Sequence, residues 1–321
     1  MAFIQKINSK ARTSIDTGFG VNAASYGGRF VNKNGGANIK KTGLGFLEQY
    51  SWFHSMLAMS KIKFFIIILL FYILVNIAFT VVYYLVGVEH LSGLEETHSA
   101  VAKFVETFFF SSQTFTTVGY GRISPVGFAT SAVAAFQALI GLLSFAVATG
   151  LMYGRFSRPK AYLKFSHNAI IAPYKDIKAL MFRLAPFKNT TLTDAEAKVT
   201  LALICEENGK SVNKFYPLEL EFPKINNLNL SWTIVHPITE DSPLHGFSEA
   251  DYKNTKGELI VFVKAFDDMF SNTVVSRSSY LFDEMVYGAK FLPMYHRNEI
   301  NNSTVLELSK LNEFTKVNLE L

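Results

Sequence analysis

Two long stretches of the chain are apolar almost throughout and contain no charged residue. The first covers residues 64–88, with Asn76 as its main polar interruption, and the second covers residues 126–154 and continues to about Phe156. Both exceed the ~20 residues that a helix needs to cross a bilayer. A helix of about 30 residues is roughly 45 Å long, so the second must tilt or extend beyond the ~30 Å hydrocarbon core. The pattern predicts two transmembrane helices.

A shorter apolar stretch lies between these spans. Residues 103–115 read K-F-V-E-T-F-F-F-S-S-Q-T-F, a helical pattern that is too short to cross a membrane. A partial span is tolerated at membrane depth only where protein buries it, so we interpret this stretch as a re-entrant pore helix. Its C-terminal dipole would favour a cation beyond its end. An extracellular amphipathic loop is the alternative, and the segment that follows argues against it.

That segment, Thr117-Val118-Gly119-Tyr120-Gly121, reads T-V-G-Y-G. Four such loops around one axis form a potassium selectivity filter, whose backbone carbonyls replace the hydration shell of K⁺. Carbonyls that point inward one after another require partly left-handed backbone, which Gly119 and Gly121 adopt freely. We expect the Thr117 hydroxyl to add an oxygen, and Val118 and Tyr120 to point away from the axis.

The filter motif fixes the expected ligands and the expected assembly. The predicted metal sites hold K⁺ ions on oxygens of Thr117, Val118, Gly119 and Tyr120, and no organic cofactor is expected. One loop supplies only a quarter of each ion site, so the motif predicts a homotetramer. Neither span has an arginine at every third position, so no voltage sensor is expected.

Basic residues flank the spans, which indicates the orientation of the chain. The segment between the spans contains acids instead, including Glu89, Glu95 and Glu96. The positive-inside rule therefore predicts a multi-pass cell-membrane protein with both termini in the cytoplasm. The net charge of +5 does not suggest nucleic-acid binding, because the basic clusters lie beside the spans. The basic residues nearest the two spans form a predicted anionic-phospholipid site, with simple positive-inside anchoring as the alternative: Lys61, Lys63, Arg155, Arg158 and Lys160.

The remaining segments complete a prediction of four parts. Residues 1–48 contain a Gly-, Asn-, Lys- and Ser-rich stretch and are expected to be a flexible cytoplasmic segment. Residues 49–60 carry Trp52, Phe53, Met56, Leu57 and Met59 at helical spacing, which favours an interfacial slide helix, although an ordinary soluble amphipathic helix has the same pattern. Residues 61–158 form the predicted transmembrane pore domain. Residues 159–321 form the predicted cytoplasmic domain.

Period-two patterns in this last part predict an all-β sandwich. Apolar alternation suits strands at residues 179–184, 198–206, 232–236, 258–266 and 272–280. Turn signals such as Glu207-Asn208-Gly209-Lys210 separate them. The sequence shows neither a phosphate-binding glycine loop nor a Cys/His metal pattern, so no enzyme is predicted. The single Cys205 excludes an internal disulfide.

Several blocks in order resemble the inward-rectifier potassium channel family. They are Phe165-Ser166-His167-Asn168-Ala169 with Ile170-Ile171-Ala172, then Pro237-Ile238-Thr239, Asp241-Ser242-Pro243-Leu244, and Ser276-Arg277-Ser278-Ser279-Tyr280-Leu281. With the filter, the resemblance covers roughly residues 49–297. Within the family, the chain is similar to the bacterial branch. It implies a homotetramer whose immunoglobulin-like cytoplasmic domain extends the pore, and in which lipid binding couples that domain to a gate.

The chain departs from the family pattern at three positions. Many members carry a glutamate behind the filter where this chain has Gln113, and an arginine where it has Ile123, beside Arg122. The usual buried ion pair is therefore missing. Strong rectifiers carry an acid in the second span, and the matching position is Phe145. Acids of the cytoplasmic vestibule, such as Glu206 or Glu207, could still attract polyamine or Mg²⁺ blockers.

The second span carries the predicted gating elements. Phe145 and Tyr153 lie about 80° apart around a helix and could share its pore-facing side, where fourfold rings would gate by steric closure and dewetting. Lipid-facing or interhelical aromatics are the alternative, and the resemblance favours the gate. Gly141 and Gly150 are predicted hinges, although Gly150-x-x-x-Gly154 equally suits close helix packing. Gln137 is predicted to face the cavity and offer an amide oxygen to hydrated K⁺.

These features together predict a potassium-selective channel gated at the inner-helix bundle and modulated by its cytoplasmic domain and by anionic lipid. A weakly selective cation channel is one alternative, because selectivity depends on surroundings such as Gln113. A subunit of a potassium transporter is the other, although such proteins use several linked repeats, whereas this chain has one filter.

Overall fold

A computed structural model describes residues 8, 10, 11, 13, 18, 19, 28–43, 45, 51–95, 99–207 and 210–319, without the side chains of residues 206 and 207. The chain divides into two compact units. Residues 42–158 form the helical unit, and residues 1–41 with 159–321 form the β unit. Each unit is described by itself below.

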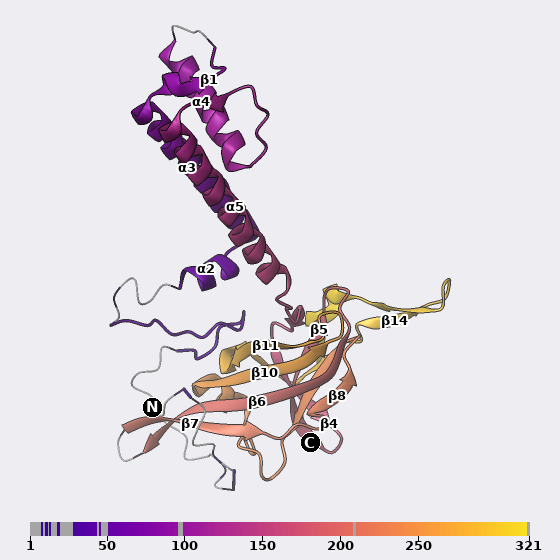
Figure 1. Cartoon of the computed structure of the whole chain (residues 1–321). Coiled ribbons are helices and arrows are strands. Elements are labelled where there is room, and N and C mark those ends of the chain that lie inside the picture. The colour runs from indigo at the N-terminus through magenta and orange to yellow at the C-terminus, as the bar shows by residue number, and fades with distance from the viewer. Residues whose placement is uncertain are drawn as a thin grey trace. The chain divides into compact units, whose positions relative to one another are not determined.

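The helical unit contains the two predicted spans. They are helices α3 (Lys61–Val86) and α5 (Phe128–Phe156), both long and apolar enough to cross a membrane. They run side by side over much of their length (Figure 1). The Ser60 hydroxyl accepts a hydrogen bond from the Lys63 amide and so caps the start of α3, and Gly87 ends it. The prediction of two spanning helices is confirmed.

Shorter elements complete this unit. Helix α4 (Ala100–Phe115) begins three residues before the predicted start, because Ser99 caps it. It contacts both α3 and α5. Helix α2 (Trp52–Ala58) lies within the predicted slide helix, whose first two residues fall outside the described ones. The 3₁₀ turn η2 (Val88–His90) leads into strand β1 (Leu91–Ser92), which pairs with β2 (Ser124–Pro125).

The β unit is a two-sheet sandwich, as the alternation predicts. One sheet has the order β11-β10-β6-β7, with β8 beside β6; the other has the order β12-β4-β5-β3, with β9 beside β5 (Figure 1). The strands of the first are β6 (Leu192–Glu207), β7 (Lys210–Leu218), β8 (Lys224–Asn227), β10 (Gly257–Asp267) and β11 (Asn272–Leu281). Those of the second are β3 (Leu163–Phe165), β4 (Ala169–Tyr174), β5 (Ile177–Pro186), β9 (Trp232–Pro237) and β12 (Met285–Tyr287).

Smaller elements border the sandwich. The pair β13 (Ala289–Phe291) and β16 (Phe314–Lys316) and the pair β14 (Tyr295–Asn298) and β15 (Ser303–Leu306) are antiparallel. The short helices are α6 (Glu249–Asn254), η3 (Phe282–Glu284) and η4 (Leu308–Asn312). The main core lies between the two sheets, where residues such as Leu201, Leu259 and Tyr280 are fully buried. Alternate residues of each strand supply it, which is the physical basis of the period-two pattern.

The N-terminal hairpin, residues 29–38, differs from the predicted flexible segment. Val31 and Ala37 form an antiparallel bridge around a turn, in which Gly35 has a φ of +82°. A Cβ on Gly35 would lie 2.7 Å from the Arg277 carbonyl of β11, so the hairpin approaches the sheet closely. Val31 is only 3% exposed. Composition suggested an extended or disordered tail, but contacts made with residues more than 200 positions later hold this part in place.

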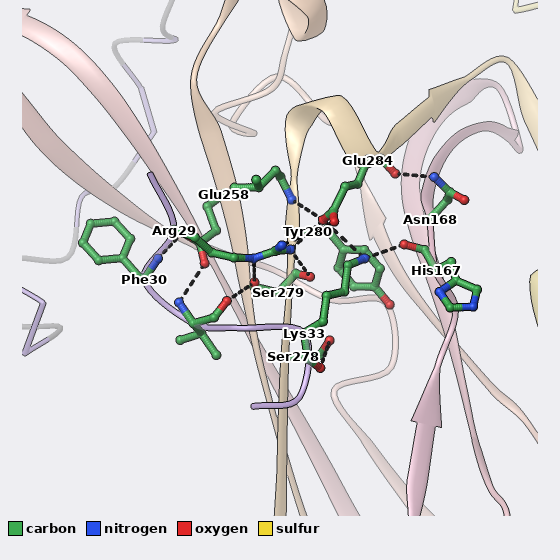
Figure 2. Close-up of polar contacts among 12 residues, drawn as sticks. Arg29, Phe30, Lys33, His167, Asn168, Glu258, Ser278, Ser279, Tyr280 and Glu284 are labelled. Carbon is green, nitrogen blue, oxygen red and sulfur yellow. Dashed lines mark hydrogen bonds and ion pairs between the residues drawn. The ribbon is translucent and has the colours of Figure 1, made fainter. Parts of the chain in front are cut away.

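Charged groups fasten the hairpin to β10 and β11 (Figure 2). The buried Glu258 carboxylate accepts hydrogen bonds from the backbone amides of Phe30 (2.6 Å) and Val31 (3.0 Å). Arg29 pairs with Glu284 at 2.6 Å and also donates to the Ser279 carbonyl at 3.1 Å. These bonds satisfy polar groups that would otherwise be costly to bury.

Glu284 forms ion pairs with both Lys33 and Arg29, and the pKa shifts indicate which pair is stronger. Burial lowers the pKa of Lys33, more than Glu284 at 3.3 Å raises it. Burial by itself raises the pKa of Glu284, but hydrogen bonds from the Leu281 amide and Arg29 and the charge of Lys33 lower it below its ordinary value overall. Arg29 is therefore the principal cation of Glu284, because it lies closer and donates in a bidentate contact.

Candidate ion-conduction site

The T-V-G-Y-G segment has the alternating backbone that its sequence requires. Thr117, Gly119 and Gly121 have positive φ values of 59°, 52° and 83°. A Cβ on Gly119 would meet no atom within 4 Å, so glycine is needed there for its backbone conformation and not for space. Thr117 adopts the left-handed region despite its branched Cβ, which is a strained state for such a residue.

The pore helix holds this backbone directly. Helix α4 ends at Phe115, and the Gln113 carbonyl in its last turn accepts hydrogen bonds from the amides of Val118 (3.0 Å) and Gly119 (3.4 Å). Val118 and Tyr120 are 54% and 80% exposed in the single subunit. Any displacement of α4 is therefore passed to the filter segment through two backbone bonds.

Gln137 does not face a cavity, and that prediction is wrong. Its side chain is 0% exposed and lies between α5, α3 and α4. Its amide nitrogen donates to the Ser111 carbonyl (2.9 Å) and hydroxyl (2.6 Å), and its amide oxygen accepts from the Tyr83 hydroxyl (2.8 Å). An amide this fully bonded inside one subunit has no oxygen left to offer an ion in a central cavity.

Asn76 completes this buried cluster, here called the amide network (Asn76, Tyr83, Ser111 and Gln137). The Ser111 hydroxyl donates to the Asn76 side-chain oxygen at 2.9 Å, and the Asn76 nitrogen donates to the Tyr72 carbonyl at 2.8 Å. All four members have a relative exposure of 0%. Every donor in this series of hydrogen bonds has an acceptor, and linked hydrogen bonds strengthen one another in a low-dielectric setting.

The glycines of α5 serve packing at two positions. A Cβ on Gly141 would lie 1.9 Å from the Phe115 carbonyl, so α5 touches the end of the pore helix with its backbone. A Cβ on Gly154 would lie 3.2 Å from Leu57 of α2. Gly150 has nothing within 4 Å. Close packing thus accounts for Gly141 and Gly154, and Gly150 is the glycine whose predicted hinge role has no competing packing explanation.

The two predicted gate residues are the exposed aromatics of the inner helix. Phe145 is 73% exposed and Tyr153 is 74% exposed in the single subunit. Phe145 lines an apolar cavity of about 790 Å³ that Thr117 and Phe115 also border. Both side chains are therefore free to meet other copies of the chain or lipid.

Arg155 has a partly different role from the predicted one. Its guanidinium donates to the Met56 carbonyl at 2.5 Å and the Met59 carbonyl at 2.8 Å, and it lies over the Phe64 ring. It thus satisfies the C-terminal carbonyls of α2. Lys61, Lys63 and Arg158 are exposed in the same unit, whereas Lys160 belongs to the β unit.

Comparisons with known proteins agree with this architecture. The family model described as "Inward rectifier potassium channel C-terminal domain" matches residues 163–321, and the one described as "Ion channel" matches residues 63–158. The chain is similar to "Inward rectifier potassium channel Kirbac3.1" of Paramagnetospirillum magnetotacticum, with 30% identity over 90% of this chain and 96% of that one. The chain belongs to the inward rectifier potassium channel family.

Vertebrate members of the family are also similar. The protein "ATP-sensitive inward rectifier potassium channel 12" of Gallus gallus is 28% identical over 83% of this chain and 67% of its own length, and that of Bos taurus matches equally. The matched families are ion channels, so the chain is a membrane channel subunit and not an enzyme. The fold class predicted from sequence is confirmed.

The region behind the filter is built differently from the expected ion pair. Ile123 is buried, and the neighbouring Arg122 pairs instead with Glu106 of α4 at 2.7 Å and with Glu95 at 3.1 Å. Gln113 contributes its backbone carbonyl to the filter. Arg122, the cation that follows the filter, thus forms ion pairs with the N-terminal half of the pore helix and with the loop before it.

Sequence reasoning missed most of the groups that bond the pore helix to α3 and α5. Asn76 was visible as the polar interruption of the first span, which was the available signal, but nothing indicated its partners Ser111 and Gln137. His236 of the β unit is buried between the Glu219 carbonyl (2.6 Å) and the Ser242 hydroxyl (2.8 Å), which is a structural position. Glu206 and Glu207, the predicted vestibule acids, have side chains outside the described ones.

Proposed function

We propose that four copies of this chain form a pore that conducts K⁺ passively and selectively down its electrochemical gradient. The observation that carries the proposal is the alternating positive φ of Thr117, Gly119 and Gly121, directly after a pore helix. K⁺ ions bound by oxygens of residues 117–121 are the only cofactor that it requires. The exposed Val118 and Tyr120 side chains supply the surface against which neighbouring copies would pack.

Flux through the purified protein in liposomes tests this proposal. We expect K⁺ and Rb⁺ flux well above Na⁺ flux, from particles that light scattering identifies as tetramers. Gly119→Ala should abolish or degrade selective flux, because a Cβ opposes a φ of +52°. Gly45→Ala is the matched control, since no atom lies within 4 Å of its Cβ and it needs no positive φ. Equal K⁺ and Na⁺ flux in wild type, or a functional dimer, would contradict the proposal.

A weakly selective cation channel is the second candidate. The observation that favours it is Gln113, whose neutral side chain replaces the acid that many relatives are expected to use behind the filter. The same flux measurement separates the two candidates, because the weakly selective channel predicts a K⁺/Na⁺ ratio near one. A transporter subunit is disfavoured, since both matched families are channels.

We assign the gate to Tyr153 and, as a second ring, to Phe145, with Gly150 as the hinge. Both aromatic side chains are exposed on the inner helix, where four tilted helices would converge. Tyr153→Ala should raise basal flux and leave the K⁺/Na⁺ ratio unchanged, because the filter is separate. A variant that assembles normally with wild-type basal flux would place the gate elsewhere.

Phe145 also bears on rectification. It carries no charge that could hold a polyamine or Mg²⁺ in the cavity, so block by internal spermine should be weak in wild type. Phe145→Glu should strengthen that block, as measured from current–voltage curves with internal spermine. An unchanged curve would mean that the side chain does not face the conduction path.

Anionic phospholipid is the proposed regulator, acting through Lys61, Lys63, Arg155, Arg158 and Lys160, with both termini in the cytoplasm. Lys61, Lys63 and Arg158 are exposed and available to headgroups, each contributing about 1 kcal/mol. Lys61→Gln with Lys63→Gln should weaken the response of flux to anionic lipid in the liposomes. An unchanged lipid response would reduce these residues to orientation anchors. We also propose the predicted division of the chain after residue 48 into a slide helix at residues 49–60, a pore domain at residues 61–158 and a cytoplasmic domain at residues 159–321.

A further inference from the structure

Two contacts fix the pore helix against the inner helix, one helical turn apart. Gln137 of α5 bonds to Ser111 of α4, and four residues further along both helices Gly141 meets the Phe115 carbonyl. Side chains four positions apart lie on the same face of a helix. One contact alone would let α4 slide or rotate along α5, whereas two in register resist both movements.

Helix α3 also forms hydrogen bonds with this contact between α4 and α5. Ser111 donates to Asn76 of α3, and Tyr83 of α3 donates to the Gln137 oxygen. Gln137 thus contacts both other helices, as do its partners Ser111 and Asn76. Two residues after Ser111, the Gln113 carbonyl binds the amides of Val118 and Gly119. A path of hydrogen bonds and two residues of α4 therefore joins Gln137 to the filter backbone.

We propose that Gln137 is a positioning residue for the selectivity filter, acting through Ser111 on the pore helix. This inference rests on the proposed potassium-selective function. A neutral amide suits the task because it donates and accepts at once, and because a charge at this depth would be costly without a partner. The network takes the place, on the inner-helix side, of the ion pair that the chain lacks behind its filter.

Selectivity in a variant that still assembles is the decisive measurement. Gln137→Met keeps a similar volume but removes the side-chain hydrogen bonds to Tyr83, Asn76 and Ser111. We expect its K⁺/Na⁺ permeability ratio to fall roughly tenfold, the equivalent of about 1.4 kcal/mol, which two interhelical bonds in a membrane can supply. Thr107→Val is the matched control: the hydroxyl of this buried residue of α4 donates to the Lys103 carbonyl of its own helix. Its ratio should stay at the wild-type value.

The outcomes separate this inference from the proposed function. Selective wild-type channels with an unchanged ratio in assembled Gln137→Met would overturn the inference alone. Wild-type channels without preference for K⁺ would overturn the proposed function and this inference with it. If Gln137→Met fails to form tetramers, Tyr83→Phe decides, because it removes one hydroxyl and keeps the ring; a smaller loss of selectivity supports the inference, and a wild-type ratio overturns it.

Discussion

The helical unit and the β unit both bury polar groups, but they use different chemistry. The amide network joins three helices with neutral hydrogen bonds alone and is 0% exposed. The N-terminal hairpin is held by charges: the Glu258 carboxylate and the Arg29–Glu284 pair. Both arrangements satisfy their donors and acceptors, so the need for hydrogen bonds does not explain the difference.

The surroundings explain it. An ionised side chain in a lipid-embedded bundle loses its hydration without recovering it from nearby water, so charges there are rare and need partners. The hairpin packs on the surface of the β-sandwich, where Glu284 keeps about a quarter of its side chain exposed (26%). There a charge strengthens a hydrogen bond at a smaller desolvation cost. The comparison teaches that the medium around each unit, and not the burial of one side chain, decides which polar groups a sequence can use for the same purpose, since Glu258 is itself only 1% exposed.

Placing a carboxyl in the amide network should have the largest effect. In Asn76→Asp, the carboxyl must stay protonated to donate to Tyr72 and accept from Ser111. Keeping it protonated at pH 7 costs up to about 4 kcal/mol, at about 1.4 kcal/mol per pH unit above an ordinary value near 4. Tetramer stability in detergent, measured by thermal unfolding, should therefore drop at pH 7 and recover as the pH falls towards 5.

The exposed residue Asn226 supplies the control for that prediction. Asn226→Asp makes the same chemical change on the β unit and should leave the unfolding temperature and its pH dependence as in wild type. If Asn76→Asp is as stable as wild type at pH 7, the helical unit tolerates a buried charge, and the difference drawn between the two units is wrong.

Removing a charge from the hairpin contact should have an intermediate effect. Glu258→Gln keeps the shape, but one of the two backbone amides then faces an NH₂ group. Hydrogen bonds to a charged group contribute about 1.5–3 kcal/mol, so the amides of Phe30 and Val31 should exchange with solvent roughly 10- to 100-fold faster. Hydrogen exchange on the intact channel measures this. Glu249→Gln, a half-exposed glutamate paired with Lys253, should not alter their exchange.

The pH dependence of the hairpin should be smaller and opposite in sign to that of Asn76→Asp. The pKa of Glu284 is below its ordinary value of 4.5, so its stabilising contribution is present above that pH and is lost as the pH falls through the lowered pKa. Protection of residues 29–38 from hydrogen exchange should decrease in that pH range. The effect is modest because the pair is partly screened by water.

Glu284→Gln isolates this contribution, since the other acids near the hairpin are unchanged. The difference in protection between wild type and this variant should vanish at low pH. Lys33 does not interfere, because its lowered pKa starts from 10.5, far above this range. A difference that stays constant from pH 7 to pH 3 would show that Glu284 acts through packing and not through its charge.

Sequence reasoning succeeded where a local pattern has one physical solution. Uncharged runs near 25 residues long have to be spanning helices, and T-V-G-Y-G after a short helix requires the positive φ values found at Gly119 and Gly121. It failed at Gln137, because hydropathy reveals that a helix spans but not how it is rotated. A polar residue in a span can face a cavity or a neighbouring helix, and only the positions of α3 and α4 decide between them.

The prediction of a flexible segment at residues 29–38 failed for a related reason. Its Gly- and Asn-rich composition indicates weak local preferences, and local preferences are all that composition reports. The groups that hold it, Glu258, Ser279 and Glu284, come more than 220 residues later, so their proximity depends on the completed sandwich.

The sequence by itself determined the two spans, the filter backbone, the β-sandwich and the family, because each rests on short-range periodicity or on contiguous motifs. Only the tertiary structure decided that Gln137 lies behind the pore helix, that Arg155 bonds to the carbonyls at the end of α2, and that residues 29–38 pack on the sheet. Hydrogen bonds between distant segments have no sequence period, since their geometry exists only after the elements have packed.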